Sequence, residues 1–191
     1  APVHLFIHGG YWQRNDKTGS SYVARSLAPA GVVTVVANYG LVPDVTMAEV
    51  VEHVRAAVAW VHAHAAEYGG DPARFTVSGH SAGGHLAAML LATDWAARGL
   101  PAGLVRAACG ISGLYDLEPI RLCYLNDVLA MDWPTANALS PLALPAPAAG
   151  RLLLAVGGTE GPEFHRQAHA LAAAWSHAAL DVQVLDLPGD D

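Results

Sequence analysis

Short apolar runs alternate with longer amphipathic or alanine-rich segments along most of this chain. This alternation predicts a mostly parallel β-sheet between two layers of helices, because strands covered on both faces are almost continuously Val, Leu and Ile. The predicted strands are Val3–Ile7, Val32–Ala37, Phe75–Ser78, Val105–Cys109, Leu152–Val156 and Val182–Leu185. The predicted helices are roughly Gly19–Ala28, Met47–Tyr68, Gly83–Ala97 and Pro162–Ala179. The pattern therefore indicates a three-layer α/β sandwich.

The stretch 114–147 interrupts the alternation. It contains Tyr115, Tyr124, Trp133 and several prolines, and it shows no strand pattern. Long excursions inside a compact domain are often lids or binding loops. We expect a single domain over residues 1–191, with a lid-like excursion over a site at the strand ends.

Composition narrows the class of protein. With 53% hydrophobic and 14% charged residues over 191 positions, the chain can bury a sizeable core. The net charge is −7 and Lys17 is the only lysine, so neither nucleic acid nor an anionic membrane is an expected partner. Cys109 and Cys123 have no metal-type spacing and indicate reduced thiols in a cytoplasmic protein. We expect no bound metal and no cofactor.

A serine lies where a predicted strand turns into a predicted helix. Gly79-His80-Ser81-Ala82-Gly83 follows Phe75–Ser78 and precedes a helix-forming run. In this context G-x-S-x-G predicts a nucleophile turn, with glycines where the tight bend leaves no room for side chains. Ser81 is therefore the candidate nucleophile, and a structural turn serine is the alternative.

A second glycine motif follows the first strand. In His8-Gly9-Gly10-Tyr11-Trp12, the two glycines allow backbone amides to point into a cavity. Together with the amide of Ala82, Gly9 and Gly10 are predicted to form an oxyanion hole, whereas alone they would indicate an ordinary turn. His8 is expected to brace this loop. Tyr11 and Trp12 are candidate substrate-binding residues because they lie beside the predicted hole.

The acid and the base of a catalytic triad should follow later strands. Glu160 lies in the loop after Leu152–Val156 and is the predicted acid, while Glu163 lies in a first helical turn and is the alternative. The base of the triad cannot be assigned in the same way, because no histidine follows His177. His80 is expected to project away from Ser81. We therefore predict that the triad histidine lies outside this sequence.

Two further histidines, His165 and His169, are four residues apart on a predicted helix without the glutamate of a zinc-protease motif. They are interpreted as packing or solvent-facing residues. The chain begins within two residues of a strand, without an initiating methionine, and stops in what resembles a loop. It is expected to be a fragment.

These motifs together resemble the α/β-hydrolase superfamily, and within it the kynurenine formamidase branch close to the hormone-sensitive-lipase-like esterases. The narrower resemblance rests on Tyr11-Trp12, on Gly113-Leu114-Tyr115-Asp116-Leu117 with Pro119, and on the segment 160–167. It implies that Glu160 occupies the acid position, which is usually Asp. It also implies that two strands precede this sequence and that the histidine follows Asp191 in the C-terminal loop.

The resemblance implies a serine hydrolase acting on a small-molecule substrate, as an arylformamidase that hydrolyses N-formylkynurenine. A short-chain carboxylesterase with the same residues in the same roles is the alternative. A non-catalytic ligand-binding protein is the alternative of another class, should the histidine be truly absent. The sequence leaves a homodimer open.

Overall fold

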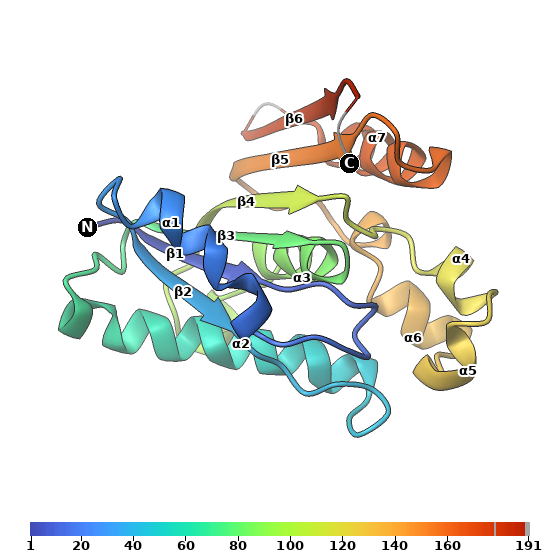
Figure 1. Ribbon diagram of the computed structural model, residues 1–191, viewed down its shortest axis with the longest axis horizontal. Helices are drawn as coiled ribbons and strands as arrows, with labels where there is room; N and C mark the ends of the chain where they lie inside the picture. Colours follow the sequence, from blue (N-terminus) through green and yellow to red (C-terminus); the bar gives the residue numbers. More distant parts are fainter. Residues whose placement is uncertain (178, 190–191) are drawn as a thin grey trace.

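The computed structural model describes residues 1–177 and 179–189, and Figure 1 shows their arrangement. Within these residues six strands form one sheet in the order β2-β1-β3-β4-β5-β6, and every neighbouring pair is parallel. The strands are β1 Val3–Ile7, β2 Val33–Ala37, β3 Phe75–His80, β4 Val105–Ile111, β5 Gly150–Gly157 and β6 Leu180–Leu187. All six predicted strands are confirmed.

The helices connect these strands. The α-helices are α1 Ala24–Leu27, α2 Met47–His64, α3 Ala82–Leu91, α4 Glu118–Arg121, α5 Asn126–Leu129, α6 Trp133–Ala138 and α7 Pro162–Trp175. Short 3-10 helices are η1 Thr18–Val23, η2 Ala65–Tyr68, η3 Ala96–Arg98 and η4 Pro141–Ala143. A capping box starts α2, in which Thr46 and Glu49 each bond the other's backbone N–H. Its valines Val50, Val54 and Val58 then face the core.

Two predicted helices end earlier than expected. The helix predicted to reach Ala179 ends at Trp175, and the run predicted to reach Ala97 ends at Leu91. The Thr93 hydroxyl donates to the carbonyl of Met89, and the Trp95 indole donates to the carbonyl of Leu90. These side chains satisfy the last carbonyls of α3, so the backbone turns without continuing the helix.

The two faces of the sheet differ in burial. Val3, Leu5 and Ile7 are fully buried on the face that α3 packs against. On the opposite face, His4 is half-buried and its imidazole bonds the hydroxyls of Thr76 and Ser78. The main core therefore lies between the sheet and its helices on the first face, where burial of apolar surface contributes most of the stability.

Strand order sets the position of the site. Parallel strands end at the same edge, and ligands of open α/β sheets bind outside these carboxyl ends. Because β3 lies between β1 and β4, the turn after β3 has the loop after β1 on one side and the loop after β4 on the other. Ser81 N–H donates to the carbonyl of Ile111 (2.8 Å), and Ser112 N–H donates to the carbonyl of Ala155 (2.7 Å). The ends of β3, β4 and β5 are thereby tied together.

Candidate active site

Ser81 lies in a strained turn between β3 and α3. Its φ of 55° and ψ of −119° are rarely adopted by residues with a side chain. Its carbonyl accepts hydrogen bonds from the N–H groups of Gly84 (2.8 Å) and His85 (3.2 Å), which start the helix. Ala82, the first helical residue, has an N–H without a partner in the helix, as at every helix N-terminus. The backbone thus holds the Ser81 hydroxyl beside a free amide and the positive end of a helix dipole.

The glycines around Ser81 allow close backbone contacts. A Cβ on Gly79 would lie 2.2 Å from the carbonyl oxygen of Gly83, and a Cβ on Gly83 would lie 2.0 Å from that of Ile7. A Cβ on Gly9 would lie 3.0 Å from Cβ of Ser81. The glycine positions of both motifs are therefore required by packing of the turn against the loop after β1.

Gly83→Ala is expected to destabilise the protein by about 3 kcal/mol or more, because the added methyl group must displace backbone. Gly103→Ala is the matched control, since its Cβ would meet nothing within 4 Å. Chemical denaturation of both variants checks this expectation. Equal stability of the two variants would contradict the close approach of α3 to β1.

The loop after β1 has an unusual backbone. Gly10, Tyr11 and Trp12 have φ values of 118°, 49° and 59°. The loop is held by the N–H of Gln13, which donates to Gly10 O (3.0 Å), and by the amide of Asn15, which donates to Gly9 O (3.2 Å). A run of positive φ values turns successive peptide groups into a strained bend, of the kind that clusters at functional sites.

His8 braces this loop, as predicted. Its ring stacks on Tyr39 with centroids 4.4 Å apart, and the Tyr39 hydroxyl donates to the carbonyl of His8 (3.0 Å). The His8 Nδ1 donates to the carbonyl of Gly9 (2.9 Å). These contacts fix the peptide groups that precede the strained bend.

The placement of Trp12 differs from the expectation that it contacts substrate. Its indole is fully buried and donates from Nε1 to Nδ1 of His85 (3.2 Å), while His85 Nε2 donates to the carbonyl of Leu139 (2.8 Å). Burial lowers the pKa of His85 to about 4, so the ring is neutral at pH 7. Trp12 therefore anchors the loop to α3 and does not line the substrate cleft, because a two-residue glycine bend carries its side chain inward.

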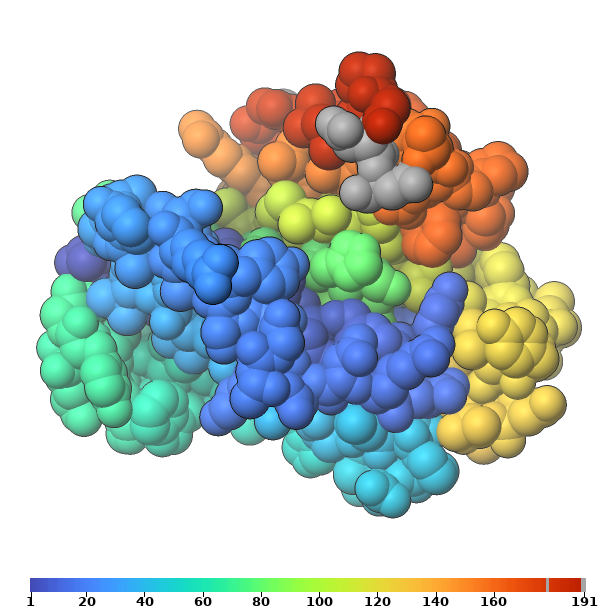
Figure 2. Space-filling view, viewed as in Figure 1, coloured from blue at the N-terminus to red at the C-terminus, as the bar shows by residue number. Residues whose placement is uncertain are grey.

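A cleft of about 640 Å³ opens beside Ser81. Its walls come from the loop after β1, from η1 and from the β3–α3 turn. In Figure 2 the blue surface of the first two of these segments lies beside the green surface of the chain near residue 80. The lining residues are Phe6, His8, Gly9, Gly10, Tyr11, Arg14, Asn15, Asp16, Thr18, Gly19, Ser20, Tyr22, His80 and Ser81. Tyr11 is one of these lining residues, and its contact with substrate stays a prediction.

His80 also lines this cleft, and its expected direction away from Ser81 stays a prediction. A Cβ on Gly9 would lie 3.3 Å from its Nδ1. The exposed imidazole extends along the loop after β1, because the turn reverses the chain next to Gly9. In residues 1–177 and 179–189, no histidine ring is hydrogen-bonded to Ser81 or Glu160. That a triad histidine lies outside this sequence stays a prediction.

Glu160 follows β5 and is held by the chain on both sides. Its N–H donates to the carbonyl of Gly157 (3.1 Å), and the Ser112 hydroxyl donates to its Oε1. Ser112 is buried at the end of β4, between the strands that carry Ser81 and Glu160. The predicted acid therefore lies at the same sheet edge as the predicted nucleophile, two strands away.

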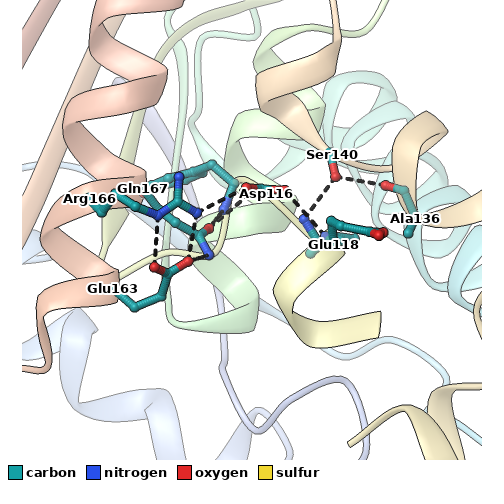
Figure 3. Close-up of polar contacts among 9 residues, drawn as sticks. Asp116, Glu118, Ala136, Ser140, Glu163, Arg166 and Gln167 are labelled. Atoms are coloured by element: carbon teal, nitrogen blue, oxygen red, sulfur yellow. Dashed lines mark hydrogen bonds and ion pairs between the residues drawn. The ribbon is translucent and has the colours of Figure 1, made fainter. Parts of the chain in front are cut away.

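Glu163 has a different environment. Its carboxylate pairs with Arg166 (2.6 Å) and accepts from the amide of Gln167 (2.9 Å), as Figure 3 shows. The Arg166 guanidinium holds the pKa of Glu163 below its usual range. Arg166 also contacts Asp116 (2.9 Å). Glu163 thus belongs to an ion-pair network that joins α7 to the loop after β4.

The excursion 114–147 folds into α4, α5, α6 and η4, which lie beyond the arrowheads of β3 and β4 in Figure 1. Its start is fixed by buried Gln167, whose Oε1 accepts from the N–H groups of Tyr115 (2.6 Å) and Asp116 (2.8 Å). The residues that line the cleft beside Ser81 come from the segment between Phe6 and Tyr22 and from His80 and Ser81, and none belongs to the excursion. A lid role for the excursion therefore stays a prediction.

Sequence reasoning missed Ser112 and Gln167. Each forms hydrogen bonds to residues about 50 positions away, so no local pattern indicates them. It also missed Arg14 and Asp16, whose charges line the cleft only because η1 folds back beside Ser81. His165 and His169 both contact the Asp186 carboxylate, at 2.9 and 3.1 Å. Among the described residues, no group of three or more His, Cys, Asp or Glu is arranged to hold a metal.

A parallel sheet with helices on its faces and a strained serine turn after β3 define an α/β-hydrolase fold. Thermogutta terrifontis esterase 2, solved phosphoramylated by tabun, has the same arrangement. The TM-score is 0.80 at 25% identity, over 98% of this chain and 72% of that one. Residues 1–100 match the BD-FAE family model, and the chain belongs to the BD-FAE family.

Named relatives of the chain are hydrolases. It is 33% identical over 195 residues to the kynurenine formamidase of Danio rerio, covering all of this chain and 65% of that protein. It is 36% identical over 155 residues to the probable carboxylic ester hydrolase LipM of Mycobacterium tuberculosis, covering 74% of this chain and 36% of that protein. The chain thus spans about two thirds of the length of the formamidase it matches. No helix within residues 1–177 and 179–189 is long and apolar enough to cross a membrane.

Proposed function

We propose that this chain carries the nucleophile, acid and oxyanion hole of a serine hydrolase of the arylformamidase type. The observation that carries the proposal is Ser81, which sits in a strained turn, lines a cleft and abuts Gly9. Similarity to the formamidase along the whole chain supports the substrate class. The matched esterases keep a short-chain carboxylesterase as the second candidate.

In the proposed reaction, Ser81 Oγ attacks the formyl carbon of N-formylkynurenine and passes its proton to a histidine that Glu160 orients. The oxyanion of the tetrahedral intermediate is stabilised by the amides of Gly9, Gly10 and Ala82. The arylamine leaves with a proton from the histidine, and water then releases formate from Ser81. A formyl group is small enough to fit a site in which two glycines lie beside the carbonyl carbon.

The charges in the cleft favour the formamide over a neutral ester. Among the lining residues, Arg14 and Asp16 carry the two formal charges, and hydrogen bonds from Thr18 keep the pKa of Asp16 below its usual range. N-formylkynurenine carries a carboxylate and an ammonium group, which a guanidinium and a carboxylate complement. A neutral short-chain ester has neither charge.

Arg14→Gln is expected to raise KM for N-formylkynurenine about tenfold while leaving that for p-nitrophenyl butyrate unchanged, since only the first substrate has a carboxylate. Arg25→Gln, an exposed change on α1, is the control. Steady-state kinetics of the full natural protein test this expectation. Preference of the wild type for the butyrate ester would favour the carboxylesterase. Hydrolysis of neither substrate would favour a non-catalytic binding role.

A further inference from the structure

Ser112 occupies a structurally special position that the reaction above does not use. It follows Ile111, the residue whose carbonyl accepts the N–H of Ser81, and its own N–H donates to Ala155 in β5. It is only 3% exposed. Ser112 is therefore bonded to β5, the strand that precedes Glu160. Its neighbour Ile111 is bonded to Ser81, which follows β3.

The backbone of Ser112 is in the left-handed region, with a φ of 48°. This conformation suits glycine and is strained for residues with a Cβ. Strain at a buried position persists when the surroundings impose it, and it clusters at functional sites. What the Ser112 side chain adds, relative to a glycine, is a hydroxyl that donates to Oε1 of Glu160.

That hydrogen bond has two chemical effects. A donor to a carboxylate fixes the rotation of a side chain that belongs to a loop. It also occupies one carboxylate oxygen and leaves the other for the N–H of a histidine ring. A carboxylate must be ionised and oriented to hold a triad histidine in the correct tautomer.

The loop that carries Ser112 is itself fixed. Shortly after Ser112, the N–H groups of Tyr115 and Asp116 donate to Oε1 of buried Gln167 in α7. The Ser140 hydroxyl accepts from the N–H of Leu117 (2.8 Å). It also donates to the carbonyl of Ala136 (2.7 Å), as Figure 3 shows. These contacts hold the loop in place, so the Ser112 hydroxyl has a defined position at the end of β4.

We propose that Ser112 is a positioning residue for hydrolysis: its hydroxyl orients the Glu160 carboxylate. The role rests on the function proposed above, because it needs Glu160 to act as the acid. Ser112 itself does not touch the substrate. It acts through Glu160, and its loss changes how well the histidine is oriented and how readily it is protonated.

The test compares Ser112→Ala with Ser112→Gly in the full natural protein, measuring kcat, KM and the pH dependence of kcat/KM. Both variants are expected to lose about tenfold in kcat with little change in KM. The pH dependence of kcat/KM should change as well, because a carboxylate that is no longer held in place pairs differently with the histidine that this profile reports. Ser112→Gly should melt at a higher temperature than Ser112→Ala, because glycine relieves the strained φ.

The two variants separate positioning from a merely structural role. If Ser112→Gly keeps the wild-type kcat and pH profile, the hydroxyl has no part in the reaction and the proposal is wrong. If activity instead follows melting temperature across the two variants, the role is structural and the proposal is also wrong. If the wild type hydrolyses nothing, or Ser81→Ala stays active, the proposed function fails and the role of Ser112 falls with it.

Discussion

Ser81→Ala is expected to lower kcat/KM of the full natural protein by about 10⁴-fold or more, on either candidate substrate. Removal of the nucleophile in a serine hydrolase leaves only the rate that binding and the oxyanion hole supply. The fold should not change, because the Ser81 backbone bonds to Ile111, Gly84 and His85 do not use the hydroxyl. Far-ultraviolet circular dichroism and the melting temperature check this second expectation.

Ser26→Ala is the matched control for this loss. Ser26 is exposed on α1, so its replacement should leave both activity and melting temperature unchanged. Turnover by Ser81→Ala within tenfold of the wild-type rate would contradict the role of Ser81. If Ser81→Ala is inactive because it does not fold, Ser81→Cys tests the role of Ser81 instead, since it keeps a nucleophile of similar size at the same turn.

Replacement of Glu160, just before α7, and of Glu163, in its first turn, is expected to have very unequal effects on kcat. Glu160→Gln should lower kcat roughly 10³- to 10⁴-fold, because an amide cannot stabilise the imidazolium that forms during attack. The amide oxygen can still accept the Ser112 hydroxyl, so the loop geometry should be retained. Circular dichroism and steady-state kinetics at several pH values measure both effects.

Glu163→Gln is the comparison. Its carboxylate pairs with Arg166 at a partly exposed position, and such pairs contribute about 0–1 kcal/mol to stability. We expect its kcat within about threefold of wild type. If Glu163→Gln instead proves the more damaging change, the acid is Glu163 and the assignment of Glu160 is wrong.

The sequence predicts the sheet well because its inner strands β1, β3, β4 and β5 are largely buried and read as apolar runs between turn residues. Phe75–His80 extends only two residues past its predicted end, since the strand continues into the glycine that begins the turn. Helix limits are less predictable: α3 ends early because Thr93 and Trp95 bond its last carbonyls, and these contacts depend on side-chain position.

The site residues also divide into those that a local sequence pattern indicates and those that depend on tertiary contacts. Motifs indicate Ser81, Gly9 and Gly10 because a tight turn and a close backbone approach require small residues at fixed spacings. They do not indicate Ser112, which reaches Glu160 across 48 residues. The burial of Trp12 also escapes the sequence, because a substrate wall and a core anchor need the same kind of side chain.

The central claim is that Ser81 is an activated nucleophile, and covalent labelling tests it most directly. A fluorophosphonate should react with Ser81 of the full natural protein, with loss of fluoride and formation of an Oγ–P bond. Intact-mass measurement and peptide mapping should find one adduct, on Ser81, in the wild type and none in Ser81→Ala. An unlabelled wild type, or an adduct that persists in Ser81→Ala, would contradict the claim.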